Sequence, residues 1–217
     1  MHKKANIISN IIICSVLLTV SFFVLTVDIS ETYVGITAPL YSGNTHTNSV
    51  SIMFVVDDNT DSNTITQISN TLQNARSNAT FFVSGRWVTR NIETTRTLAE
   101  KYELGNYGFT ATKLNIGDKN KIKSEIENCH NLVLSATNIR MNLFSPPEQK
   151  YNKNTLSVAE NLGYKTILPT QKDNDDYSAG DLILLPANDE TAKNLARIIS
   201  GILAKNLHIV RVGDNIG

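Results

Sequence analysis

Two adjacent carboxylates follow an apolar run in the stretch MFVVDDNT, residues 53–60. Asp57 and Asp58 stand where the β-branched run SVSIMFVV ends and polar turn residues begin. Paired acids in such a place suit a metal site, in which one carboxylate binds the ion and its neighbour accepts a proton. A solvated turn after a buried strand would put the same residue types there. The remaining elements of the chain bear on this choice.

Strands and helices are expected to alternate from residue 50 onward. Helical patterns occur in five segments: 64–75, 91–102, 119–137, 152–164 and 189–205. Runs typical of buried strands lie between and around them: SVSIMFVV, ATFFVSG, MNLFSPP, KTIL, DLILL and LHIVRV. This alternation predicts an α/β fold with a parallel sheet and helices outside it, either open or closed into a barrel.

Three candidate segments fall at the predicted carboxyl ends of strands. They are the acid pair Asp57 and Asp58, the stretch 145–149 and the stretch 186–189. In parallel α/β folds the functional loops lie at this end of the sheet. We therefore expect the three segments to meet and to form the site.

The first thirty residues differ in kind from the rest. Lys3 and Lys4 precede 21 uncharged residues, 7–27, close to the ~20 that a helix needs to cross a bilayer. The positive-inside rule predicts a cytoplasmic segment 1–6, a transmembrane signal anchor 7–27 and an extracytoplasmic remainder. A cleaved signal peptide, which would leave a secreted protein, is the alternative. Polar residues 28–49 are predicted to form a stalk before a domain at 50–214.

Composition limits the classes of function. The 217 residues suffice for one good core. Lys+Arg 20 and Asp+Glu 20 give no net charge, which argues against a nucleic-acid partner because such proteins carry a basic surface. Cys129 is the single cysteine beyond the predicted anchor, so the exported domain is expected to have no internal disulfide.

Several segments, in order, resemble the polysaccharide deacetylase family, the NodB-homology domain of carbohydrate esterase family four. They are ATFFVSGRWV, LGNYGFT, FSPPEQKYN, ENLGYKTIL and DLILLP, and the resemblance covers about residues 50–212. It implies a distorted (β/α) barrel that removes N-acetyl groups from amino sugars in chitin-like polymers or peptidoglycan. The family reaction uses a divalent metal, usually zinc, held by one Asp and two His, with an Asp as base and a His as acid.

The acid pair matches the first family motif, which implies that Asp57 is the base and Asp58 the metal ligand. The second motif fails, because Tyr107 and Ala111 stand where the two metal-binding histidines are expected. Alanine has no ligand atom, and a phenol with an ordinary pKa near ~10 is a poor zinc ligand at neutral pH. Two of the three expected metal ligands are therefore missing, and we expect no bound zinc.

The remaining motifs are also degenerate. The third, normally Arg-Pro-Pro-Tyr-Gly, reads SPPEQ from Ser145, so the arginine is absent. The fourth motif's Asp falls near Lys172, and the fifth motif's acid His is replaced by Pro186. The other histidines of the exported part are interpreted as satisfied or solvated: His46, His130 and His208.

We interpret the exported domain as a catalytically inactive deacetylase-like protein that binds cell-wall glycan or an envelope partner. The alternative is an active metal-dependent deacetylase with a rearranged site, and a third possibility is a purely structural envelope component. Aromatic and proline side chains near the old cleft could contact sugar rings: Tyr107, Phe109, Pro147 and Tyr151. Trp87 is assigned to core packing, because large aromatic residues are usually buried.

Overall fold

The computed structural model describes residues 13, 15–16, 38–171 and 176–217. Residues 36–217 form one compact unit, which contains every strand that the structure describes. The predicted segments 1–6 and 7–27 lie outside the described residues except at three positions, so the signal anchor stays a prediction. Among the residues described, no helix is long and apolar enough to span a membrane.

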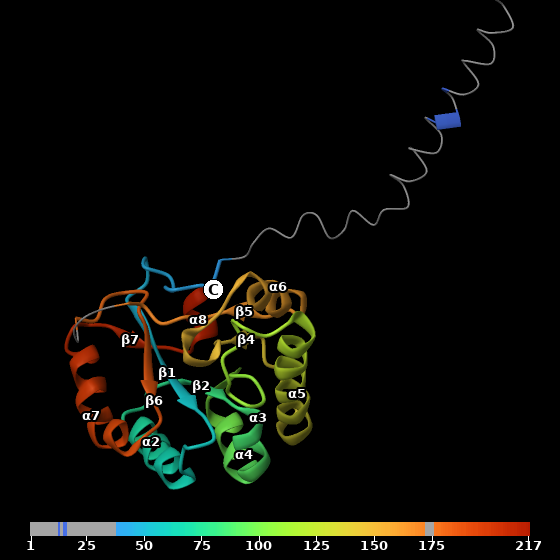
Figure 1. The fold of residues 1–217 in the computed structure, drawn as a ribbon. Coiled ribbons are helices and arrows are strands. Elements are labelled where there is room, and N and C mark those ends of the chain that lie inside the picture. Colours follow the sequence, from blue (N-terminus) through green and yellow to red (C-terminus); the bar gives the residue numbers. More distant parts are fainter. Residues whose placement is uncertain (1–12, 14, 17–37, 172–175) are drawn as a thin grey trace, which may run out of the picture. The chain divides into compact units, whose positions relative to one another are not determined.

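The compact unit is built around a parallel sheet with the strand order β5-β4-β3-β2-β1-β6, and β7 pairs with the start of β1. The sheet curls into an incomplete barrel with helices on its outside (Figure 1). This confirms the predicted parallel α/β architecture. The strands are β1 Ser49–Val56, β2 Thr80–Val83, β3 Glu103–Asn106, β4 Leu143–Phe144, β5 Lys165–Thr166, β6 Leu182–Pro186 and β7 His208–Ile209.

Most of the helices start at a side chain that caps the backbone. The caps of α2, α3, α5, α6 and α7 each accept a hydrogen bond from a backbone N–H of the first turn: Asp61, Ser84, Asp118, Asn152 and Asn188. The helices are α2 Ser62–Asn74, α3 Gly85–Arg90, α4 Ile92–Lys101, α5 Lys119–Thr137, α6 Lys153–Asn161, α7 Asp189–Leu203 and α8 Val212–Ile216, with a 3-10 turn η2 at Pro147–Gln149.

The two faces of the sheet carry separate apolar clusters. Along β1, Ile52 and Phe54 pack outward with the helices, while Met53 and Val55 point into the barrel. This alternation follows from the two-residue period of a strand. Phe82 of β2 joins the interior cluster, whereas its neighbour Phe81 stacks on Phe54 with ring centroids 5.0 Å apart. Burial on both faces explains the nearly continuous apolar sequence of β1.

The described part of the predicted stalk, residues 38–49, packs on the barrel, and we call it the strap. Leu40 forms a parallel bridge with Ile167 beside β5. Further along, the Gly43 N–H donates to the carbonyl of Gly180, and the Asn44 N–H donates to the carbonyl of Asn215 at 2.8 Å. The folded domain therefore begins before residue 50, the boundary that the sequence analysis predicts.

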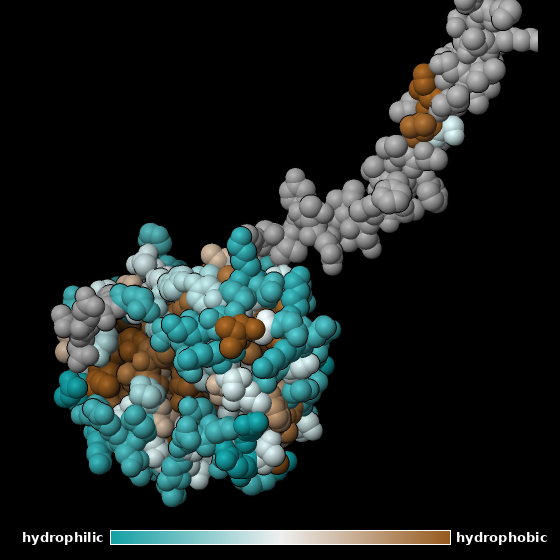
Figure 2. All heavy atoms as spheres, in the orientation of Figure 1, coloured by the Kyte–Doolittle hydropathy of each residue, from teal (hydrophilic) through white to brown (hydrophobic). Residues whose placement is uncertain are grey.

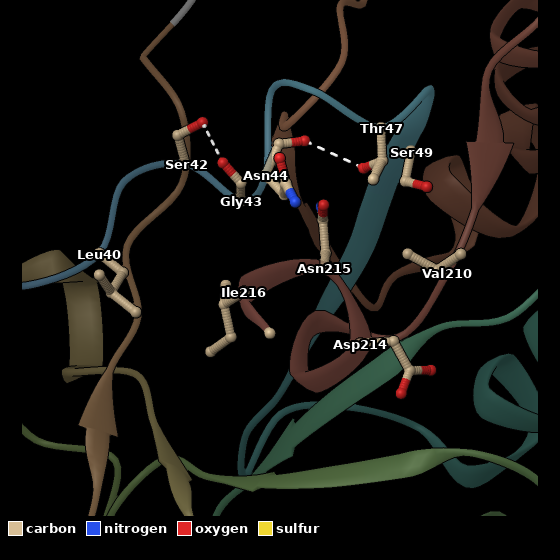
Figure 3. Close-up of a pocket in the computed structure, with 11 residues that line it drawn as sticks. Leu40, Ser42, Gly43, Asn44, Thr47, Ser49, Val210, Asp214, Asn215 and Ile216 are labelled. Atoms are coloured by element: carbon tan, nitrogen blue, oxygen red, sulfur yellow. Dashed lines mark hydrogen bonds between the residues drawn. The ribbon is translucent and has the colours of Figure 1, made fainter.

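The last predicted strand, LHIVRV, is a strand only at β7 and continues as helix α8. Val212 starts this helix because its backbone N–H binds the Thr80 hydroxyl, and the next N–H, of Gly213, binds the Glu103 carboxylate. A cavity of about 350 Å³ lies between α8 and the strap, with Asn215 at its wall (Figure 3). It lies at the strand starts, opposite the end that carries Asp58.

Glycine at position 105 of β3 is required by packing. A Cβ there would lie 2.4 Å from the ring of Phe82, so Gly105→Ala should destabilise the domain by roughly 1–3 kcal/mol through overpacking. Gly201, inside α7, has nothing within 4 Å of its Cβ position. Gly201→Ala is the control and should stabilise by about 0.5–1 kcal/mol. Urea unfolding measures both, and equal effects would contradict the packing assigned to β3.

Candidate functional site

Backbone hydrogen bonds beyond the strand ends hold the predicted site segments in one row. The Ala187 N–H donates to the carbonyl of Val55 and the Ser84 N–H to the carbonyl of Val56. Two further bonds continue the row, from the Tyr107 N–H to the Val83 carbonyl and from the Ser145 N–H to the Asn106 carbonyl. The ends of β6, β1, β2, β3 and β4 are therefore consecutive, and the predicted segments lie along the same edge of the sheet.

Asp58 lies among hydrogen-bond donors and positive charges. The Ser84 hydroxyl donates to its Oδ1 at 3.3 Å, while the guanidinium groups of Arg86 and Arg90 lie 3.7 and 3.6 Å from its carboxylate oxygens. Arg90 also donates to the backbone carbonyl of Asp58 at 2.8 Å. Both arginines come from the short helix α3, whose N-cap is Ser84. One helix thus supplies the groups that balance the charge of this carboxylate.

Asp57 holds the turn that follows β1. Its Oδ1 accepts a hydrogen bond from the backbone N–H of Asn59 at 2.9 Å, and its own N–H donates to the Thr60 hydroxyl at 3.2 Å. Such contacts are typical of an aspartate that closes a turn. Asp57 also lies near enough to Tyr107 for its negative charge to contribute to the raised pKa of that phenol.

Tyr107 and Ala111 occupy the positions expected for two histidines without supplying metal ligands. The Tyr107 side chain is buried, and its hydroxyl accepts a hydrogen bond from the Glu148 N–H at 3.0 Å. Burial raises the pKa of this phenol above its ordinary value, and the charges of Asp57 and Glu148 raise it further, against the opposing hydrogen bond. The phenol is therefore neutral at physiological pH and already engaged in supporting η2.

The side chains present do not fit a resident zinc ion. Structural and catalytic zinc sites use three or four protein ligands, whereas the described side chains that contact the carboxylate of Asp58 are a serine and two arginines, Ser84, Arg86 and Arg90. Across residues 38–171 and 176–217, no group of three or more His, Cys, Asp or Glu side chains is placed to hold a metal. No step of a metal-assisted reaction can be assigned to these residues.

The other degenerate positions offer no catalytic group either. Ser145 is buried, and its hydroxyl has no hydrogen-bond partner among the described residues. Pro186, at the end of β6, is exposed and has no titratable atom. Lys172 lies outside the described residues. Ser145 therefore cannot act as the orienting arginine that the resemblance implies, and Pro186 cannot act as the acid histidine.

The side chains predicted to contact glycan differ in exposure. Tyr107 and Pro147 are buried, whereas Phe109 and Tyr151 are half-buried. Figure 2 also shows apolar side chains in a hollow over β6. Within β6 itself, Ile183, Leu184 and Leu185 are half-buried. Trp87 is fully buried and donates to the Thr60 carbonyl, which confirms its assignment to the core.

A family model described as polysaccharide deacetylase matches residues 42–167, more than half of the chain. The chain belongs to the polysaccharide deacetylase family. A curated relative is the uncharacterized protein YlxY of Bacillus subtilis (strain 168), which is 22% identical over 151 residues. The match covers 62% of this chain and 47% of YlxY, so the chain spans about half the length of that relative.

Solved structures share the fold of this polysaccharide deacetylase domain. BA3943 of Bacillus anthracis, described as a CE4 family pseudoenzyme, has a TM-score of 0.77 at 19% identity, covering 83% of this chain and 69% of its own. A mutant of BA3943 is described as having restored enzymatic activity. The peptidoglycan N-acetylglucosamine deacetylase Bc1960 has a TM-score of 0.76 at 16% identity, covering 86% of this chain and 96% of its own.

A buried polar network lies beneath the second family motif. The Oδ1 of Asn106 accepts a hydrogen bond from the Gly108 N–H, and its Nδ2 donates to the Ile126 carbonyl and to the Tyr164 hydroxyl. Tyr164 in turn contacts Nδ1 of His130 at 2.5 Å. Burial raises the pKa of Tyr164 to about 12, so its phenol stays protonated at neutral pH. This network fixes the backbone that follows β3.

The interpretation of His130 as a satisfied histidine is confirmed, but its partner Tyr164 was not predicted. The asparagine in the stretch LGNYGFT was the available signal, because a buried asparagine at a strand end needs partners. His130 lies on α5 beside Cys129, which is buried and has its pKa raised to about 12 by that burial. The two neighbours therefore serve separate structural functions and do not form a metal pair.

The network predicts a pH-dependent stability. Burial, with a smaller effect from Arg140, lowers the pKa of His130 below its ordinary 6.5 in the folded protein. The unfolded chain then binds more protons below about pH 6.5, so the free energy of unfolding should fall as the pH is lowered through this range. His130→Gln removes the titrating group. Urea unfolding from pH 7.5 to 5 should give a shallower slope for this variant than for the wild type, and identical slopes would contradict the assignment.

Proposed function

We propose that this protein is a membrane-anchored, extracytoplasmic member of the polysaccharide deacetylase family that binds cell-wall glycan and does not hydrolyse it. In this proposal the segment 7–27 is an uncleaved signal anchor, and the domain faces the cell wall. No resident metal is required. The support comes from the degenerate site, from the intact family fold and from the charge pattern of the first thirty residues.

One observation carries the proposal of inactivity. The carboxylate of Asp58, the single remaining position of the family's metal triad, is flanked by the guanidinium groups of Arg86 and Arg90. Two positive charges beside it disfavour a divalent cation at the same carboxylate, because like charges repel strongly at short range. A lone carboxylate also cannot replace the three or four ligands that hold zinc.

Loss of the other roles supports the same conclusion. Glycan deacetylation needs an activated water, a base and an acid for the leaving amine acting together. Asp57 remains as a carboxylate, but its Oδ1 and N–H are used in the turn after β1. The acid position is Pro186, which has no proton to give. A single surviving group does not constitute a catalytic site.

The choice of glycan as the ligand rests on what the domain retains. The core on both faces of the sheet is complete without a metal, so the scaffold is stable in its inactive form. The relative Bc1960 is named for deacetylation of peptidoglycan N-acetylglucosamine, and we carry over its substrate class as a ligand class. The apolar hollow over β6 suits the apolar face of a sugar ring.

The proposal is tested with the full chain in detergent. We expect it to sediment with insoluble peptidoglycan and to release no acetate from N-acetylated glycan. EDTA should change neither result. Asp57→Asn should leave glycan binding unchanged, since this acid serves a turn. Acetate release that EDTA abolishes would instead support the alternative of an active enzyme with a rearranged site. Recovery of envelope proteins without glycan would favour a protein partner.

A gain of metal binding is expected when the missing ligands are returned. Tyr107→His together with Ala111→His would place two imidazoles on the loop next to Asp58, and histidine tolerates the positive φ of 51° at position 111. The double variant should bind about one zinc ion per chain by calorimetry, because three protein ligands outweigh the repulsion from the solvent-exposed Arg86 and Arg90. The wild type and the double variant carrying Asp58→Asn should bind none. Equal zinc binding by the wild type would contradict the proposal.

A further inference from the structure

The backbone of η2 adopts a conformation that its side chains do not favour. Glu148 and Gln149 are consecutive non-glycine residues with φ of 54° and 58°. Left-handed backbone is strained for residues with a Cβ and persists where the surroundings impose it. Here the turn is imposed by the Tyr107 hydroxyl, which receives the Glu148 N–H, and by the Pro146 carbonyl, which receives the Gln149 N–H. Glycine would satisfy this backbone without strain, so the glutamine side chain calls for an explanation.

The side chain of Gln149 belongs to a surface group formed by three separate segments. Its Oε1 faces the Nε2 of Gln171 at 3.4 Å. Two residues after it, the hydroxyl of Tyr151 meets the hydroxyl of Tyr41 at 2.5 Å. We call Tyr41, Gln149, Tyr151 and Gln171 the Tyr-Gln platform. It joins the strap, the loop after η2 and the chain that follows β5.

The platform is exposed and yet held in place. Tyr41 is 42% exposed, and no other Phe, Trp or Tyr among the described residues is classed as exposed. Its backbone is fixed, because its carbonyl receives the Thr170 hydroxyl at 2.7 Å and the neighbouring Leu40 bonds to Thr166 and Leu168. An aromatic ring kept at the surface on a fixed backbone loses little entropy when it binds a ligand.

The chemistry of the platform selects an uncharged, hydroxyl-rich ligand. Two phenol rings offer flat apolar faces with polar tips, and two amides offer both donors and acceptors. None of the four side chains is a carboxylate, amine or guanidine, and the hydroxyl contact with Tyr151, followed by burial, raises the pKa of Tyr41 above its ordinary value. A neutral pyranose ring matches this set, with one apolar face and hydroxyl groups at its edge.

We propose that the Tyr-Gln platform is a sugar-binding subsite for an uncharged N-acetylhexosamine ring of the glycan. The inference rests on the proposed function and names the residues that carry it out. The turn η2 links the platform to Tyr107, which stands at a family histidine position, because the Tyr107 hydroxyl supports the strained turn that presents Gln149 and Tyr151. The substitution that removes a metal ligand therefore also positions a binding surface.

The test separates stability from binding. Gln149→Gly relieves a positive φ and removes the amide, so the full chain should unfold at a higher urea concentration and bind a neutral tetramer of N-acetylglucosamine about fivefold more weakly. Tyr41→Ala should weaken binding by about tenfold through loss of ring contact. Asn206→Gly is the control, because Asn206 has φ of 57° in the turn after α7 and is not one of the platform residues. It should leave binding unchanged.

The outcomes are distinguishable. If the wild type binds the tetramer and the variants Gln149→Gly and Tyr41→Ala bind it equally well, the Tyr-Gln platform is not a sugar-binding subsite. The proposed function then stands. If the wild type binds no glycan, both are wrong. Near-ultraviolet circular dichroism identifies any Tyr41→Ala protein that has lost its fold, and Gln149→Gly then decides alone, because it is expected to be more stable than the wild type.

Discussion

The charge of Asp58 is the main constraint on the sheet edge formed by the carboxyl ends of the strands, where the degenerate family motifs lie. A half-buried carboxylate at a strand end needs positive charge or hydrogen-bond donors close by. Here α3 supplies both, through its capping hydroxyl Ser84 and the arginines Arg86 and Arg90. In the family pattern a metal ion would balance the same charge. Under the proposed function, the acid is kept and guanidinium groups stand beside it in place of the cation, which preserves the local fold without the chemistry.

The neighbouring positions show the same exchange of chemistry for structure. Asp57 closes the turn after β1, and Tyr107 supports the strained backbone of η2. Beneath them, Asn106 ties the second motif to α5 and to Tyr164, which lies between α6 and β5 and contacts His130 of α5. Asp57, Asp58 and Tyr107 therefore each have a structural partner. Ser145 differs, because its buried hydroxyl has no partner among the described residues, and nothing in the structure explains that choice.

The sequence predicts the parts whose signal is local and periodic. The β-branched run of β1 and the long apolar face of α5 have correct boundaries to within a residue or two. Helix α3 was missed, because six residues are too few for a helical period, and the contacts of Arg86 and Arg90 with Asp58 were missed with it. The role of Tyr41 was also missed, since the strap reads as a polar stalk and packs only through residues more than a hundred positions away.

The most direct test of the account is to locate bound zinc in a crystal of this protein. Diffraction measured at the zinc absorption edge from crystals grown with zinc locates any ion by its anomalous signal. The account predicts no peak at Asp58, with the guanidinium groups of Arg86 and Arg90 beside its carboxylate. A zinc peak about 2.0–2.2 Å from a carboxylate oxygen of Asp58 would contradict it. The ligands around such a peak would identify a rearranged catalytic site.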